Sequence, residues 1–156
     1  MKFHISTDYA IRIVLHLAQC APQVASAPMA SEQLGITYPY FTKIASALKQ
    51  ASLIESVKGS GGGYRLARPA SDISLYDIVC VMQGEIHLNH CLEENGVCSL
   101  HGCGSTQCSV HQVLKEIQGD MIDKLKEQSI EELCKTNNRT QKSPPIADEE
   151  NRQGSF

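Results

Sequence analysis

Apolar residues recur at helical spacing near the start of the chain. Within residues 6–21 they occupy one face, at Ala10, Ile13, Val14 and Leu17. Steps of three and four residues predict a mostly buried helix. Ser6 or Thr7 can cap it, because a hydroxyl oxygen at this position accepts a hydrogen bond from the first turn.

Two further helices, joined by a tight turn, are predicted next. Pro28 can open a short helix that Gly35 closes, and Thr37 caps a helix over residues 38–50, whose apolar face is Phe41, Ile44, Ala45 and Leu48. The opposite face carries hydroxyl groups and lysines, which is typical of a helix-turn-helix whose second helix enters the major groove of DNA. An ordinary helical hairpin would show the same apolar spacing. The residues expected at DNA are Thr37, Tyr38, Tyr40, Thr42 and Lys43.

Two short β-like segments follow, residues 53–58 and 64–67, and the sequence GSGGG joins them. They predict a β-hairpin whose tip can approach a sugar-phosphate backbone. A nucleotide-binding phosphate loop is the alternative, but the tip lacks a terminal Gly-Lys-Ser/Thr and does not lead into a helix. We therefore predict a winged helix. Its hairpin residues expected at DNA are Lys58, Ser60, Gly61 and Arg65.

The C-terminal half is predicted to be helical apart from a central loop. Ser74 can cap a fourth helix, and Ser129 with Glu132 forms a capping box for a short closing helix. Between them, apolar residues step by three and four at Val110, Val113 or Leu114, Ile117, Met121 and Leu125. This pattern is typical of a two-helix seam, and we expect a homodimer with crossed long helices. Burial against the protein's own body is the alternative, but a short winged helix offers little surface.

The predicted fold class is mainly α with a small β-hairpin wing. A winged-helix DNA-binding region spans residues 1–84, a cysteine-rich loop residues 85–109, a dimerisation helix and a closing helix residues 110–135, and a disordered tail residues 136–156. The tail is polar, contains two prolines and lacks apolar periodicity. A dimer would present two recognition helices to the half-sites of a palindromic double-stranded DNA operator.

Composition and charge support this division. The 156 residues are 42% hydrophobic, without an apolar run of 18 residues or a signal-peptide pattern, so we expect a cytoplasmic protein with no membrane partner. Residues 1–70 hold seven basic and three acidic residues, whereas residues 71–156 hold seven basic and fourteen acidic residues. The basic half is the one that a phosphate backbone would attract.

Four of the seven cysteines lie close together, at Cys91, Cys98, Cys103 and Cys108. Sulfur donors at this density select zinc, copper(I) or an iron-sulfur cluster. Structural zinc sites favour Cys-x2-Cys pairs, which are absent here, whereas iron-sulfur clusters accept irregular spacings. A cluster is therefore favoured. A thiol enzyme with a small-molecule substrate is not expected, because no plausible nucleophile with a base is evident. Packing roles are expected for Cys20, Cys80 and Cys134.

Several stretches together resemble a known family, the iron-sulfur-cluster winged-helix regulators that include IscR, NsrR and RirA. They are STDYAIR, GSGGGYRLARP, SLYDIV, the cysteine loop and SIEEL, within residues 1 to about 134. The resemblance leans towards the nitric-oxide-sensing NsrR branch because of Asp8 and the pair Lys43-Ile44. It implies a DNA-binding homodimer, expected to be a repressor, whose DNA affinity depends on a bound cluster.

The resemblance also implies two ligand sets. Members of the NsrR kind hold a [4Fe-4S] cluster with three cysteines and, in some, an aspartate of the partner subunit at the position of Asp8. IscR members hold a [2Fe-2S] cluster with three cysteines and a histidine, which His111 would match. We prefer [4Fe-4S] and keep [2Fe-2S] as the alternative. Thr42 stands where IscR members have a glutamate, which argues against IscR-like recognition of two classes of DNA site.

The chain departs from both patterns, because it has four loop cysteines where the family usually has three. Cys91 and Cys108 match the edges of the family loop, and Cys98 and Cys103 are nearly even as the third ligand. A fully cysteine-ligated cluster and a four-thiolate zinc site are therefore alternatives. The alternative function is a zinc-stabilised or thiol-redox-switched repressor without an iron-sulfur cluster.

Overall fold

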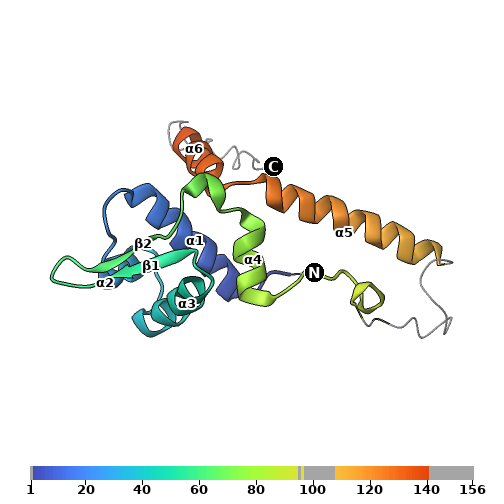
Figure 1. Cartoon of the computed structure of the whole chain (residues 1–156), viewed down its shortest axis with the longest axis horizontal. Coiled ribbons are helices and arrows are strands. Elements are labelled where there is room, and N and C mark those ends of the chain that lie inside the picture. Colours follow the sequence, from blue (N-terminus) through green and yellow to red (C-terminus); the bar gives the residue numbers. More distant parts are fainter. Residues whose placement is uncertain (1, 95, 97–107, 141–156) are drawn as a thin grey trace, which may run out of the picture.

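The computed structural model describes residues 2–94, 96 and 108–140, with side chains up to Thr136. An N-terminal body is formed by α1 (Ile5–Cys20), α2 (Ala27–Gln33), α3 (Tyr38–Gln50), β1 (Ile54–Val57) and β2 (Gly63–Leu66). The single turn η1 (Ala70–Asp72) leads to α4 (Leu75–Gln83), η2 (His90–Leu92), α5 (Ser109–Glu127) and α6 (Ile130–Thr140). The predicted mainly α fold with a hairpin wing and a long C-terminal helix is confirmed (Figure 1).

The hydrophobic core lies where α1 and α3 pack against the hairpin and α4. The predicted apolar faces of both helices are buried, and the largest fully buried side chains include Phe41, Ile13, Leu17, Ile44 and Leu48. The Phe41 ring lies 6.0 Å from the Tyr64 ring, centroid to centroid, and so joins the recognition helix to the wing. The opposite face of α3 is consequently left free to meet a ligand.

The start of α1 differs from the prediction. The helix begins at Ile5 after His4, which makes no side-chain cap, and Thr7 lies within the first turn. The Thr7 hydroxyl is buried and donates to Oε1 of Gln83, 3.0 Å away, and the same oxygen accepts the backbone N–H of His4 at 3.3 Å. The helix begins two or three residues earlier than the predicted caps implied, so the Thr7 hydroxyl lies inside the protein and links α1 to the end of α4.

The wing is an antiparallel hairpin that is anchored near its turn by the segment before α2. Ile54 lies opposite Leu66, and Tyr64 exchanges two backbone hydrogen bonds of 2.9 Å with Ala25, in the segment before α2. A Cβ atom at Gly63 would lie 2.1 Å from the carbonyl oxygen of Ala25, so only glycine permits this approach. The turn end of β2 is thus fixed to the segment before α2, and the tip of the wing extends beyond the body (Figure 1).

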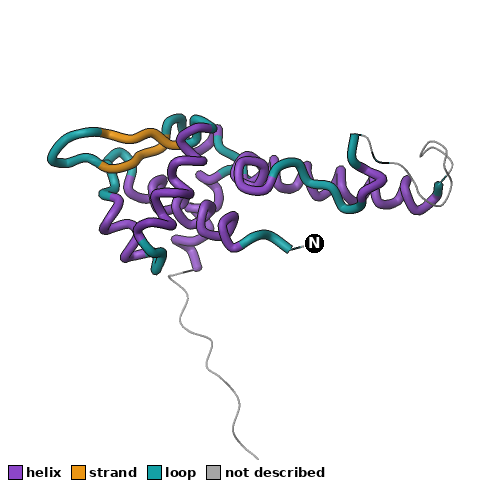
Figure 2. The backbone as a smooth tube through the Cα atoms, turned by 90° about the horizontal axis from the view of Figure 1, so that it is seen from below, coloured by secondary structure: helices purple, strands orange, loops and turns teal. Residues whose placement is uncertain are grey.

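Helix α5 forms an arm that projects from the body, as both views show (Figures 1 and 2). Its base is joined to the start of α4 by two backbone hydrogen bonds. The N–H of Leu75 donates to the carbonyl of Gln128, and that of Ile130 donates to the carbonyl of Ile73, each at 2.9 Å. Ile73 and Ile130 are fully buried, so this junction belongs to the core. No helix in the described ranges is long and apolar enough to span a bilayer.

Helix α6 is longer than predicted. It reaches Thr140, so the first five residues of the predicted disordered tail are helical, and residues 141–156 lie outside the described residues. Leu133 and Cys134 pack on the core beside α1, and the Thr136 hydroxyl donates to the carbonyl of Glu132 at 3.0 Å. Docking on α1 supports the helix beyond the point where its polar sequence predicted an end. At its start, the Ser129 hydroxyl oxygen accepts the N–H of Glu132 at 3.2 Å, which is one of the two hydrogen bonds of the predicted capping box.

We expect Phe41→Ala to lower the free energy of unfolding by about 3–5 kcal/mol, because it empties a fully buried site between α3 and the wing. Urea denaturation followed by circular dichroism measures the change. Tyr38→Ala is the matched control, since that ring is 50% exposed and its loss should change stability by less than about 0.5 kcal/mol. Equal effects of the two substitutions would contradict the described core.

Candidate nucleic-acid interface and cysteine site

The outer face of α3 presents three of the five side chains predicted at DNA. Thr37 and Tyr38 lie exposed at its start, and Lys43 lies exposed further along the helix. The Thr37 side chain makes no capping hydrogen bond, contrary to the predicted cap, so its hydroxyl can serve a ligand. A hydroxyl, an aromatic ring and an ammonium group on one helix can contact both phosphates and base edges.

Tyr40 and Thr42 are more enclosed than the other three. The Tyr40 ring packs edge to face on the ring of Tyr9, with centroids 5.7 Å apart, and thereby supports α3 against α1. The Thr42 hydroxyl donates to the backbone carbonyls of Tyr38 and Pro39, at 3.1 and 2.9 Å. The partly buried Tyr40 thus helps to orient the recognition helix.

The wing presents its predicted residues in two settings. Lys58, Ser60 and Gly61 lie exposed at the hairpin tip. Arg65 lies exposed on β2, where its guanidinium pairs with the carboxylate of Glu55 across the hairpin. To bind a phosphate, Arg65 would therefore exchange the Glu55 carboxylate for the phosphate group. Lys58, in contrast, makes no ion pair within the described residues.

The two edge cysteines of the loop lie on the arm. Cys91 is in η2, and Cys108 directly precedes α5. η2 packs against α5, and the N–H of Leu88 donates to Oε1 of Gln118 at 2.8 Å, which holds this segment along the helix (Figures 1 and 2). Both thiols are partly buried, and neither is in a disulfide. Cys98 and Cys103 lie outside the described residues.

His111 lies in the first turn of α5, one turn after Cys108. Its Nδ1 atom is buried, and no described residue provides a hydrogen-bond partner for it. A buried polar atom without a partner costs free energy, and native proteins usually supply one. The donor set of this part of the arm, soft thiols with an imidazole nitrogen available, therefore fits an iron-sulfur cluster or a zinc ion.

Asp8 lies in a different place. It is on α1 in the body, and its carboxylate pairs with the guanidinium of Arg12 at 2.8 Å. The described part of one chain contains no group of three potential metal ligands, and Figure 1 shows η2 and the start of α5 on the arm, away from α1. One subunit by itself does not bring Asp8 to Cys91 and Cys108.

The three cysteines outside the loop are partly buried. Cys20 and Cys134 pack against the core, as predicted, and burial raises the pKa of the Cys134 thiol. The Cys20 sulfur lies 3.6 Å from Nε2 of His16, and burial lowers the pKa of that imidazole. Cys80 hydrogen-bonds the phenol of Tyr76, which raises the pKa of Tyr76 to about 12.

Two supporting glutamines were not predicted. Gln83 holds α1 to α4, and Gln118 holds the segment before η2 to α5. Each is a polar residue within an otherwise apolar helical face, four residues after Val79 and Leu114 respectively. That interruption is the signal that could have identified them, because a polar side chain in such a place needs a partner.

Comparison with known proteins agrees with this geometry. Residues 3–136 match the family model of Rrf2, described as iron-dependent transcriptional regulators. Protein aau3 of Rhizobium meliloti is 29% identical over 86% of both chains. The HTH-type transcriptional regulator IscR of Vibrio atlanticus is 31% identical over 88% of this chain and 77% of its own. NsrR of Shouchella clausii is 29% identical over 85% of this chain and 88% of its own.

Solved structures show the same fold. CymR, the global cysteine regulator of B. subtilis, has a TM-score of 0.73 at 21% identity, covering 87% of this chain and 98% of that chain. T. potens IscR has a TM-score of 0.71 at 23% identity, covering 93% and 94%. The winged-helix fold and the resemblance at family level are thereby confirmed. The chain belongs to the Rrf2 family of DNA-binding transcriptional regulators.

Proposed function

We propose that this protein is a homodimeric repressor whose DNA affinity is controlled by an iron-sulfur cluster in the loop between η2 and α5. The observation that carries the proposal is the placement of Cys91 and Cys108. Both edges of the loop lie on one arm as free, partly buried thiols. Relatives that bear the names IscR and NsrR support the same assignment. Binding of a palindromic operator and a cytoplasmic location stay predictions.

Cys91, Cys108 and one of Cys98 or Cys103 would hold the cluster. Asp8 of the partner subunit would complete a [4Fe-4S] site, which we prefer, and His111 would complete a [2Fe-2S] site. Thiolates are the ligands that iron-sulfur clusters use, and an oxygen or nitrogen ligand at one iron leaves that iron accessible to nitric oxide or oxygen. In the single chain the Asp8 carboxylate is paired with Arg12, so ligation would require it to leave that partner.

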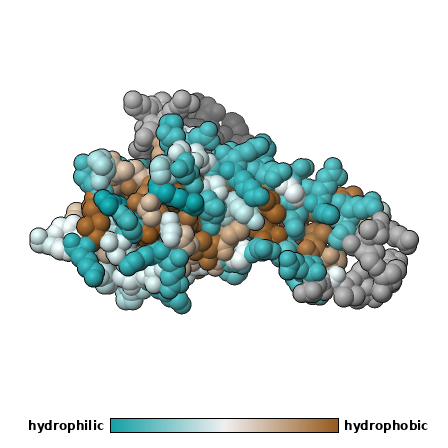
Figure 3. Space-filling view, viewed as in Figure 1, coloured by the Kyte–Doolittle hydropathy of each residue, from teal (hydrophilic) through white to brown (hydrophobic). Residues whose placement is uncertain are grey.

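Exposed apolar residues on α5 support the dimer. This helix has no buried residue, and Val110, Val113 and Ile117 are 62%, 54% and 49% exposed. Figure 3 shows hydrophobic surface along the arm. Burying apolar side chains is favourable by roughly 25 cal/mol per Å² of surface removed from water, so a second α5 laid on this seam would stabilise the pair. Two chains would also supply each arm with the Asp8 of its partner.

The DNA-binding surface would combine α3 with the tip of the wing. In each subunit Tyr38 and Lys43 would enter a major groove, while Lys58, Ser60 and Gly61 would lie beside the sugar-phosphate backbone. The proposed cluster would act at the arm, whose base is hydrogen-bonded to α4. Regulation then requires two arrangements of the dimer that differ in DNA affinity.

The alternative function is a zinc-stabilised or thiol-redox-switched repressor, because the free thiols of Cys91 and Cys108 would serve it as well. Anaerobic purification separates the two functions. A brown protein whose visible absorption bleaches with nitric oxide, with loss of operator binding, supports the cluster. A colourless protein with one zinc ion per chain supports the alternative.

We expect Cys91→Ser and Cys108→Ser each to abolish iron and sulfide binding, because both remove a thiolate from the proposed ligand set. Iron and sulfide analysis with visible spectroscopy, on protein purified without oxygen, measures this. Cys20→Ser is the matched control, since Cys20 lies beside His16 on α1, and it should keep the wild-type iron content. Full iron content in both loop variants would refute the assignment.

We expect Lys43→Ala to weaken operator binding by about tenfold and to reduce discrimination against unrelated DNA, because it removes a contact in the major groove. Arg65→Ala should weaken binding to all sequences and lower the slope of log K against log salt by about one. Fluorescence anisotropy across a salt series measures both effects. Lys135→Ala removes the same charge from α6 and should change neither quantity; unchanged binding in both test variants would contradict the winged-helix assignment.

We expect Ile117→Glu to convert the dimer into monomers, because it places a carboxylate in the proposed seam. Native mass spectrometry of the full chain measures the oligomeric state. Lys115→Glu adds the same side chain to the same helix at an exposed polar position and should leave the dimer intact. Dimers of unchanged stability in Ile117→Glu would show that α5 is not the contact.

A further inference from the structure

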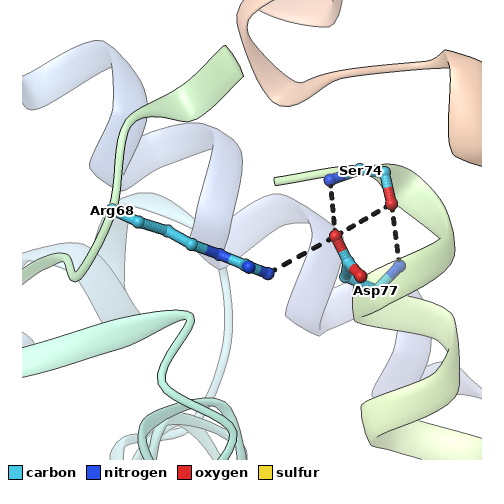
Figure 4. A network of polar contacts seen from close by, with 3 residues as sticks. All are labelled: Arg68, Ser74 and Asp77. Carbon is cyan, nitrogen blue, oxygen red and sulfur yellow. Dashed lines mark hydrogen bonds and ion pairs between the residues drawn. The ribbon is translucent and has the colours of Figure 1, made fainter. Parts of the chain in front are cut away.

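A polar network joins the base of the wing to the start of α4 (Figure 4). Oδ2 of Asp77 accepts hydrogen bonds from the backbone N–H and the hydroxyl of Ser74, both at 2.9 Å. The same oxygen lies 3.4 Å from Nη2 of Arg68, two residues beyond β2. The Ser74 hydroxyl oxygen in turn accepts the N–H of Asp77 at 3.2 Å. One carboxylate therefore serves both the helix cap and the wing.

The same turn of α4 also holds the base of the arm. Backbone hydrogen bonds join residues 73–75 to residues 128–130, where α5 ends and α6 begins. The ammonium group of Lys126 lies 5.0 Å from the centroid of the Tyr76 ring, a cation–π contact from α5 to α4. The first turn of α4 is thus in contact with the wing on one side and with α5 on the other.

We propose that Asp77, acting through Arg68, is a positioning residue for DNA binding that sets the orientation of the wing relative to the base of α5. This inference adds to the proposed function the contact through which the arm and the wing are connected. Its role in regulation rests on that proposed function. Asp77 does not touch DNA in this proposal. Together with the Ala25–Tyr64 hydrogen bonds, it would orient the hairpin that carries Lys58, Ser60 and Gly61.

The backbone around Arg68 makes such control effective. The N–H of Ala67 donates to the carbonyl of Leu53 at 3.1 Å, and the ring of Pro69 fixes its own φ angle. The backbone on both sides of Arg68 is therefore restricted. The Arg68 and Asp77 side chains are 41% and 37% exposed. An ion pair this exposed contributes little to stability, so its loss should leave the fold intact.

Substitution of Asp77 separates positioning from simple electrostatics. Asp77→Asn removes a negative charge near the DNA-binding region, and charge alone predicts tighter binding to a polyanion. Asparagine keeps a side-chain oxygen that can accept from Ser74, so the cap of α4 is retained, but it lacks the negative charge that attracts the Arg68 guanidinium. Positioning predicts weaker DNA binding instead, and the two explanations therefore predict opposite signs.

The experiment compares Asp77→Asn, Arg68→Gln and their double variant in the full chain. Hydrogen exchange of the amides of residues 54–66 is measured without DNA, and affinity for one operator fragment is measured by anisotropy. We expect each single variant to raise hairpin exchange and to weaken binding about fivefold, a size typical of coupled neighbours, with the double variant no worse than either. Lys135→Gln, which breaks the exposed pair with Glu131 on α6, is the matched control and should change neither readout.

Tighter or unchanged DNA binding by Asp77→Asn with unchanged hairpin exchange would overturn the proposal. Weakened binding by Arg68→Gln alone would instead make Arg68 a direct phosphate contact, which also overturns it. If Asp77→Asn does not fold, hydrogen exchange of the hairpin amides in Arg68→Gln tests the proposal instead, because Arg68 is not part of the α4 cap. The exchange readout needs neither DNA nor a cluster, so failure of the proposed function would not be mistaken for failure of this contact.

Discussion

The backbone hydrogen bonds between residues 73–75 and 128–130 are the constraint on which the arrangement of this protein depends. They fix the base of the long helix α5 on the winged-helix body, and buried Ile73 and Ile130 place the junction within the core. The Lys126–Tyr76 contact between α5 and α4 adds to this junction. The relation between the cysteine site on the arm and the DNA-binding surface on the body follows from it.

Charge counting along the chain overstates the positive charge that is free to meet DNA. Three arginines of the basic half are paired with carboxylates: Arg12 with Asp8, Arg65 with Glu55 and Arg68 with Asp77. Lys43 and Lys58, in contrast, make no ion pair within the described residues and lie exposed on α3 and at the hairpin tip. Among these basic side chains, those without a carboxylate partner in the described residues thus lie on α3 and at the hairpin tip, the two elements that we propose to contact DNA.

The arm combines two features that a single chain leaves incomplete. Its apolar seam is exposed along Val110, Val113 and Ile117. Its partly buried thiols, and a His111 nitrogen that has no hydrogen-bond partner among the described residues, lie near the same end of α5. Pairing of two arms would cover the apolar seam and bring further side chains to the thiols and the histidine. Our proposed dimer and our proposed cluster therefore depend on the same surface.

The sequence by itself determined the helix-turn-helix, the hairpin, the Ser74 cap and the long helix α5, because apolar spacing, glycines and caps act over a few residues. Of the predicted seam, Val110, Val113 and Ile117 are exposed, whereas Met121 and Leu125 are partly buried. The sequence motifs also identified the family. The loop cysteines indicated the kind of metal site that we propose. Only the tertiary structure decided the role of Thr7, the length of α6, and the pairing of Arg68 with Asp77. Thr7 meets Gln83 across 76 positions of sequence, and α6 is supported by docking on α1. Contacts between distant segments depend on how whole elements pack, which no local spacing encodes.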